Sequence, residues 1–132
     1  MATVKFSRSI GFWMAGAMVA SQSINALRVL HDPQGFATYF GVPLRDAGDI
    51  GFVAVYGLRA FFLAVFASVL MYLQEIRALK LMALCAVIMP IGDAYLAHHA
   101  GAPAAVVWRH SVIGVFLLLT WFFLRRTEGQ MR

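Results

Sequence analysis

The passage PIGDAYLAHHAGAPAAVVWRHSVIG, from Pro90 to Gly114, places groups that can transfer protons inside otherwise hydrophobic sequence. Asp93 lies near the end of one hydrophobic stretch, and His110 lies at a similar depth in the next. A carboxylate and an imidazole held close together can take a proton from a bound molecule and return it. We therefore expect Asp93 and His110 to be the proton-transfer residues of a candidate site.

Arg59 supplies a fixed positive charge at a comparable depth in another hydrophobic stretch. Because an arginine stays protonated there, it needs an acid, a backbone carbonyl or water beside it. Its expected role is to anchor an anionic or carbonyl-bearing molecule, with Tyr56 and Asn25 orienting that molecule through hydrogen bonds. Arg28 and Arg109 are expected to complete the binding set.

Membrane helices must position these residues, because the composition is too apolar for a small soluble domain. The apolar fraction of the 132 residues is 61%, against about 45–50% in ordinary soluble domains. Four stretches, at about 10–30, 50–73, 79–97 and 104–124, approach the roughly 20 residues that cross the hydrocarbon core of a bilayer. The sequence therefore predicts a single all-α domain over residues 1–132, an integral membrane four-helix bundle.

The connection from Pro33 to Asp49 is expected to lie at the interface between bilayer and water. Asp32-Pro33 should end the first helix, because proline lacks an amide hydrogen and restricts the residue before it. The aromatic residues that follow are typical of the headgroup region, so we expect a short interfacial helix or lid. Pro90 should kink the third helix, because it leaves the carbonyl of Ala86 without its usual donor.

The formal net charge of +5 is distributed as a topology signal. Basic residues lie at helix ends and not among aromatic residues on a polar face, which argues against nucleic acid as a partner. Seven of the eleven lysines and arginines fall on one side, so we expect both termini in the cytoplasm and the protein in a bacterial inner membrane. These seven are Lys5, Arg8, Arg77, Lys80, Arg125, Arg126 and Arg132.

Two further classes are disfavoured. A cleaved signal peptide over residues 1 to about 20 would place Met18 three positions from the usual end of the cleavage motif, where a small residue belongs. Cys85 is the single cysteine, which excludes an intrachain disulfide and a C-x-x-C redox pair. No metal or cofactor is expected. For a haem, His110 has only histidines near the membrane surface as partners. A metal ion would need His31, Asp32, His98 and His99, which lie near the membrane surface, where such residues commonly face water or headgroups.

Four motifs resemble a family of small four-helix membrane proteins from bacteria and fungi, the family of domain of unknown function 4267. The motifs are DPQGFATYFGVPL, YGLRAFFLAV, GDAYLA and WRHSVIG, and their order and spacing over roughly residues 25 to 120 carry the resemblance. It implies an arginine, an aspartate and a histidine in successive helices, here Arg59, Asp93 and His110. Where members often carry an acid after that arginine, this chain has Ala60. The resemblance implies no assigned activity.

The expected function is binding of a small lipophilic molecule, or its acid/base processing by isomerase, cyclase or hydratase chemistry; whether the protein is an enzyme stays open. One alternative is a structural or partner-subunit role, in which an Arg59–Asp93 ion pair only fixes helix packing. Another is a small proton-coupled transporter. The expected partners are the bilayer and the ligand, and the small residues of the second helix indicate either packing within the chain or a homo-oligomer. These small residues are Gly57, Ala60, Ala64 and Ala67.

Overall fold

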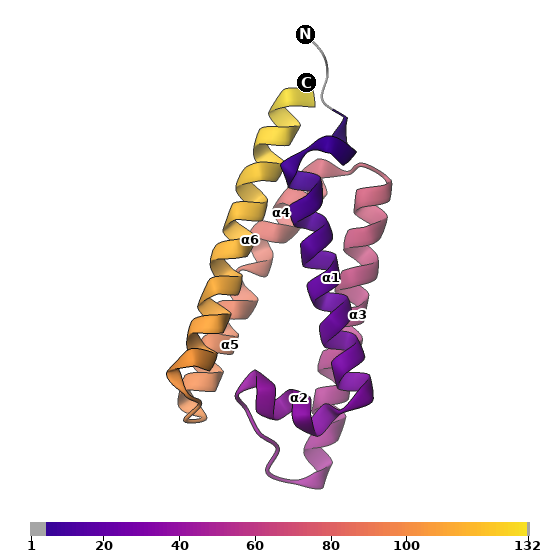
Figure 1. Ribbon diagram of the computed structural model, residues 1–132. Coiled ribbons are helices and arrows are strands. Elements are labelled where there is room, and N and C mark those ends of the chain that lie inside the picture. The colour runs from indigo at the N-terminus through magenta and orange to yellow at the C-terminus, as the bar shows by residue number, and fades with distance from the viewer. Residues whose placement is uncertain (1–4, 132) are drawn as a thin grey trace.

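The computed structural model describes residues 5–131 and contains helices joined by short connections, with no strand in this part of the chain (Figure 1). The all-α class is therefore confirmed. Arg132, one of the basic residues counted above, lies outside the described residues. The elements are η1 (Phe6–Arg8), α1 (Ile10–His31), α2 (Pro33–Phe40), η2 (Ala47–Asp49), α3 (Ile50–Tyr72), α4 (Ile76–Ala86), α5 (Ile88–His99) and α6 (Ala104–Met131).

Three helical stretches are long and apolar enough to cross a membrane: Ala47–Tyr72, Ile76–His99 and Ala104–Met131. α1 has 22 residues, a sufficient length at about 1.5 Å per residue. It is not one of the three apolar spans, because the SQSIN segment makes its second half polar. These helices indicate a membrane protein, while the expected count of four spanning helices is not confirmed.

The third expected helix is interrupted. It runs as α4 to Ala86 and resumes as α5 at Ile88. Pro90 has no amide hydrogen for the Ala86 carbonyl, so the break falls one turn before the proline. At the break, the Val87 amide donates to the Leu84 carbonyl, three residues earlier, at 3.3 Å, whereas an α-helical amide donates to the carbonyl four residues earlier. The kink expected from Pro90 is thus a break between two helices.

Two long helical hairpins form the bundle. α1 packs along α3, α6 packs along α4 and α5, and α1 also contacts α6. Figure 1 shows the start of α1 and the end of α6 at one end of the bundle, which we call the termini end. α2 crosses the opposite end, which we call the α2 end.

The hydrophobic core lies toward the termini end. There Lys80 of α4 and Glu128 at the far end of α6 form an ion pair, and α6 continues past its expected end at residue 124. The buried core residues come from η1 and from helices α1, α3, α4 and α6. They are Phe6, Met18, Ala67, Leu70, Ile76, Leu79, Ala83, Leu117 and Leu124.

The small-residue face of α3 packs on α1. A Cβ atom at Gly57 would lie 2.6 Å from Cγ1 of Val29, so the two backbones approach at a distance that only glycine allows. Ala60, Ala64 and Ala67 continue this buried face toward the termini end. Packing within the chain therefore covers the face, and the homo-oligomer considered for it finds no support.

α2 is the short helix expected between the first two long helices. Asp32 caps it, its carboxylate accepting from the Gly35 amide at 2.8 Å, and Pro33 occupies the first turn. Gly41 ends it with φ 99°, a left-handed conformation that glycine adopts without strain. The ends of α2 are thus set by local sequence, and its position across the bundle must come from contacts with α3 and α6.

Candidate functional site

A cavity of about 430 Å³ lies at the centre of the bundle, between the long helices, and α2 contributes to its wall. We call it the central cavity. Residues from every helix α1 to α6 line it. Its volume is in the range of about 300–1,000 Å³ that is typical of small-molecule sites.

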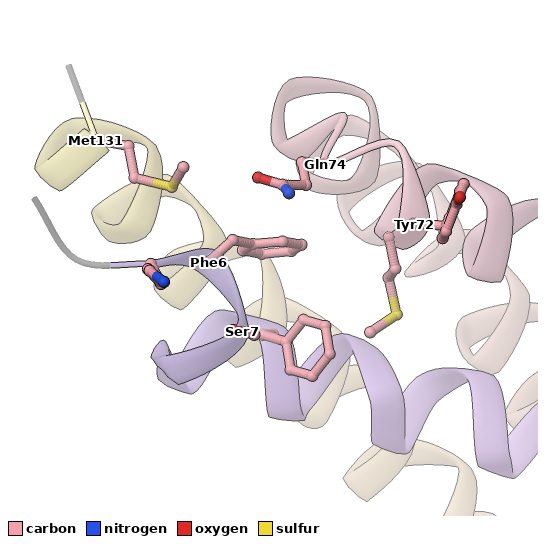
Figure 2. Close-up of a pocket in the computed structure, with 8 residues that line it drawn as sticks. Phe6, Ser7, Tyr72, Gln74 and Met131 are labelled. Carbon is pink, nitrogen blue, oxygen red and sulfur yellow. The ribbon is translucent and has the colours of Figure 1, made fainter.

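A second, larger hollow of about 610 Å³ lies at the termini end (Figure 2). Figure 2 shows Phe6 and Met131, from near the two ends of the described chain, on one side of it. Tyr72, the last residue of α3, and Gln74, in the connection to α4, lie on the other side. No carboxylate or imidazole is among the residues that line it. The central cavity is the candidate site, because it holds the acid/base residues although it is smaller.

Four polar side chains from four helices line the central cavity toward the α2 end. Asn25 of α1 is a hydrogen-bonding neighbour of Tyr56 of α3. Asp93 of α5 lies close enough to Tyr56 and to His110 of α6 for electrostatic interaction. Asp93 is partly buried, and His110 is only 3% exposed. The fold therefore brings the expected proton-transfer residues next to the expected orienting residues.

Arg59 lines the central cavity too, but its side chain is exposed on α3. Arg59 and Asp93 form no ion pair; the ion pair found among residues 5–131 is Lys80–Glu128. The Arg59–Asp93 pair considered from sequence is therefore not formed. The reason is helix packing: α3 packs on α1 and α4, and no comparable contact joins it to α5 in the described chain, so the two side chains line different parts of the cavity wall.

Arg109 and His110 both bind the C-terminal end of α2. The His110 Nε2 atom lies 2.9 Å from the Phe40 carbonyl oxygen, and Arg109 donates to the Tyr39 carbonyl oxygen. Because a carbonyl oxygen only accepts, Nε2 must carry the hydrogen in this contact. The last carbonyls of a helix have no partner within it, so α6 supplies the donors that α2 lacks. This role was not foreseen from sequence, although the unpaired carbonyls before Gly41 were a signal for it.

Arg28 lies apart from the central cavity lining. Its guanidinium carbon is 4.6 Å from the centroid of the Tyr39 ring, and that of Arg109 is 3.7 Å from the same centroid. Arg28 does not pair with Asp32 four residues later, whose carboxylate caps α2 instead. Of the seven expected site residues, Arg28 is thus the one that does not line the central cavity.

An aromatic cluster separates the cavity from the α2 end. Phe40 lies with its ring centroid 4.8 Å from that of His110 and 5.3 Å from that of Tyr56, and Phe36 lies 5.2 Å from Tyr56. Phe36 and Phe40 are on the same side of α2, four residues apart. They form the apolar wall against which His110 and Tyr56 are held, and sequence alone did not place them in the site.

The rest of the central cavity is apolar. Its lining toward the termini end consists of Met18, Leu63, Ala67, Met82, Phe116 and Leu117. Its lining on α5 includes Ile88 and Leu96, which are 73% and 54% exposed on the outer surface of the bundle. The cavity therefore has a polar part, an apolar part and a wall on α5 that reaches the outer surface.

No group of three or more histidine, cysteine, aspartate or glutamate side chains in residues 5–131 is arranged to hold a metal ion. Asp93 and His110 have no third such neighbour. The chemistry open to this set is hydrogen bonding, charge pairing and proton transfer.

Comparisons with known proteins define the family. Searches of curated proteins and of solved structures find no match to the chain. The family model described as "Domain of unknown function (DUF4267)" matches residues 10–124, which run from the start of α1 to the membrane-spanning part of α6 and include every candidate site residue. The chain therefore belongs to the DUF4267 family.

Proposed function

We propose that this protein binds a small lipophilic molecule in the central cavity, within the membrane. The observation that supports this best is that Asp93 and Arg59 lack partners within the described chain. Both line the cavity, and neither forms a hydrogen bond or an ion pair with another residue of the described chain. An ionisable group at membrane depth is costly unless it has a partner. A ligand carrying polar groups would supply that partner.

The distribution of polarity in the cavity orients the ligand. Polar atoms of the molecule face Asp93, Tyr56 and Asn25 near the α2 end, and its hydrocarbon part extends toward Met18 and Leu117 nearer the core. An acceptor group such as a carbonyl or carboxylate suits Arg59, while a hydroxyl or amine suits Asp93. Arg109, which also lines the cavity, contributes a further positive charge.

Access from the lipid lies between α3 and α5. α3 packs against α4, whereas it makes no comparable contact with α5 in the described chain. Arg59 lies exposed on the α3 side, and Leu96 lies exposed on the α5 side. A molecule dissolved in the bilayer can thus reach the cavity sideways, without crossing the aqueous surface at α2.

Acid/base processing of the ligand is the finer form of this proposal. Asp93 takes the proton, and His110 acts as its partner through Nδ1, because Nε2 is engaged with the Phe40 carbonyl. This arrangement suits an isomerase, cyclase or hydratase reaction, in which a proton leaves one atom of a substrate and returns to another. The Arg59–Asp93 ion pair named in the structural alternative does not form in the described chain.

Native mass spectrometry of gently purified protein tests the binding proposal. Wild type is compared with Asp93→Asn and Arg59→Gln, and with Asp46→Asn and Arg45→Gln, which remove the same charges from exposed positions away from the cavity. A retained small molecule that both cavity variants lose and both controls keep supports the proposal. Equal retention in all five proteins, or no retained molecule in wild type, contradicts it.

The identified molecule then separates binding from catalysis and transport. It is added back to delipidated protein, and products are sought by mass spectrometry with wild type and Asp93→Asn. A new product formed only by wild type indicates an enzyme. Ligand-dependent proton movement in sealed vesicles, without a product, indicates transport instead.

The orientation in the membrane follows from charge. Lys5, Arg8, Arg77, Arg125 and Arg126 are all exposed toward the termini end, so this end is placed in the cytoplasm of a bacterial cell. In a Cys85→Ser background, a cysteine introduced at Gln130 should resist a membrane-impermeant maleimide in intact spheroplasts, and one at Gly101 should react. The opposite labelling pattern would overturn the assignment.

A further inference from the structure

Two arginines from different helices converge on one tyrosine at the α2 end. The guanidinium carbons of Arg28 in α1 and Arg109 in α6 lie 4.6 Å and 3.7 Å from the centroid of the Tyr39 ring in α2. The two guanidinium carbons are therefore no farther apart than these two distances together. Both side chains keep contact with solvent, since Arg28 is exposed and Arg109 is partly exposed. We call this set the arginine pair.

No carboxylate neutralises the arginine pair in residues 5–131. Neither arginine takes part in an ion pair, and the nearest acid along the chain, Asp32, has its carboxylate on the Gly35 amide. Arg28 makes no hydrogen bond to the described protein, and Arg109 makes one, to the Tyr39 carbonyl. Because a guanidinium has five N–H donors, most donors of the pair are unused. Two like charges held within this distance favour an anion near both of them.

The location limits what that anion is. The arginine pair lies where α2 crosses the end of the bundle, and the neighbouring Trp108 is 70% exposed. Tryptophan and tyrosine collect at the level of lipid headgroups, and Tyr39 itself is 45% exposed. The phosphate groups of phospholipids lie at this level. Arg28, moreover, does not line the central cavity, so the arginine pair is not simply a part of it.

We propose that Arg28 and Arg109 bind the phosphate of an anionic phospholipid headgroup at the α2 end, with Tyr39 fixing the two guanidinium groups. Guanidinium groups pair with phosphate through two parallel hydrogen bonds, which an ammonium cannot do. Binding there also stabilises α2 against α6, because Arg109 already holds the Tyr39 carbonyl. The site does not depend on the proposed ligand of the central cavity.

Lipid titration monitored by native mass spectrometry tests this site. Delipidated protein is titrated with phosphatidylglycerol and, separately, with phosphatidylcholine. Arg28→Gln is the main variant, because Arg28 makes no hydrogen bond whose loss would unfold α2. Arg28→Lys keeps the charge and removes the planar fork. Arg45→Gln is the matched control, an exposed arginine in the connection after α2 that lies outside the pair.

Removing one arginine should weaken phosphatidylglycerol binding about fivefold, the equivalent of about 1 kcal/mol per basic residue near a membrane surface. Arg28→Lys should recover only part of this loss, Arg45→Gln should bind as wild type does, and phosphatidylcholine should bind weakly to all four proteins. Equal affinity of wild type and Arg28→Gln for phosphatidylglycerol would overturn the proposal. Full competition by millimolar inorganic phosphate would also overturn the lipid assignment and indicate a site for free phosphate.

Arg109→Lys tests whether lipid binding is lost through the missing headgroup contact and not through unfolding of α2. It keeps a donor for the Tyr39 carbonyl and should leave the helical circular dichroism unchanged, while it weakens phosphatidylglycerol binding as Arg28→Lys does. If Arg109→Lys binds this lipid as tightly as wild type while Arg28→Lys does not, the two arginines do not act as a pair and the proposal fails.

Discussion

The two ends of the bundle use their side chains in opposite ways. At the termini end, Leu79 and Leu124 are fully buried in a continuous apolar core, and Lys80 pairs with Glu128. Toward the α2 end the helices enclose the central cavity, whose lining includes Asp93 with no hydrogen-bond or ion-pair partner in the described chain. The first arrangement stabilises the bundle, and the second leaves Asp93 and Arg59 without a hydrogen-bond or ion-pair partner in the described chain.

This difference separates a packed region of the bundle from the region around the central cavity. Packing at the termini end holds α1, α3, α4 and α6 together. α5 makes no comparable contact with α3 in the described chain, and the central cavity lies between the long helices. The α2 end is closed by specific polar contacts and one aromatic cluster. The two ends should therefore respond differently to equivalent substitutions.

The largest effect is expected for leucine truncation at the packed end. Leu79→Ala should lower the free energy of unfolding by about 2–5 kcal/mol, because it leaves a void in a closely packed core. Leu63→Ala should cost less than half as much, because Leu63 already faces the central cavity. Equilibrium unfolding in mixed detergent micelles measures both. Equal losses would show that the wall of the central cavity is packed as closely as the core.

A smaller loss is expected where α1 and α3 approach most closely. Gly57→Ala should destabilise the protein by about 1–3 kcal/mol, because its Cβ would overlap the stiff, β-branched Val29 side chain. Gly51→Ala and Gly92→Ala are the controls, since neither Cβ would meet an atom within 4 Å. The test compares the thermal unfolding temperatures of the three variants with that of wild type in one detergent. A Gly57→Ala protein as stable as the controls would mean that α1 and α3 are not in tight contact.

The smallest effect is expected for the contact that holds α2. His110→Phe keeps an aromatic ring beside Phe40 but leaves the Phe40 carbonyl without its donor, at a cost of about 1–2 kcal/mol. The loss should be local: backbone amides of Phe36–Phe40 should exchange hydrogen faster, while those of Leu79–Ala83 should not. Ser111→Ala is the control, because Ser111 bonds only to its own helix. Unchanged exchange in α2 would show that His110 does not hold it.

Local sequence explains most of the helices. Asp32-Pro33 ends α1 and begins α2, Gly41 ends α2, and Pro90 predicts the break before α5, each through the presence or absence of a backbone donor or a permitted φ angle. Hydropathy predicts three of the four expected membrane helices. α1 is not among the three, because its SQSIN segment is polar; Ser21, Gln22 and Asn25 of this segment line the central cavity.

Helix packing decided the partners of the candidate residues. Arg59 and Asp93 have opposite charges at similar depths, which is a sound reason to expect a pair, yet α3 and α5 do not pack together and the pair does not form. Arg109 and His110 were expected to interact with a bound molecule. In the structure, the last carbonyls of α2 contact both side chains instead. Periodicity assigns a residue to a helix face, but the distance between two faces depends on how all the helices pack.

The sequence by itself thus determined the all-α class, three apolar spans and the two ends of α2, because these depend on composition, periodicity and nearby backbone donors. Only the tertiary structure decided that Asp93 and Arg59 are unpaired around a cavity, that the Gly57 face packs on α1, and that Arg28 and Arg109 share Tyr39. These are relations between residues far apart in the chain, and they depend on which helices pack together and at what distance.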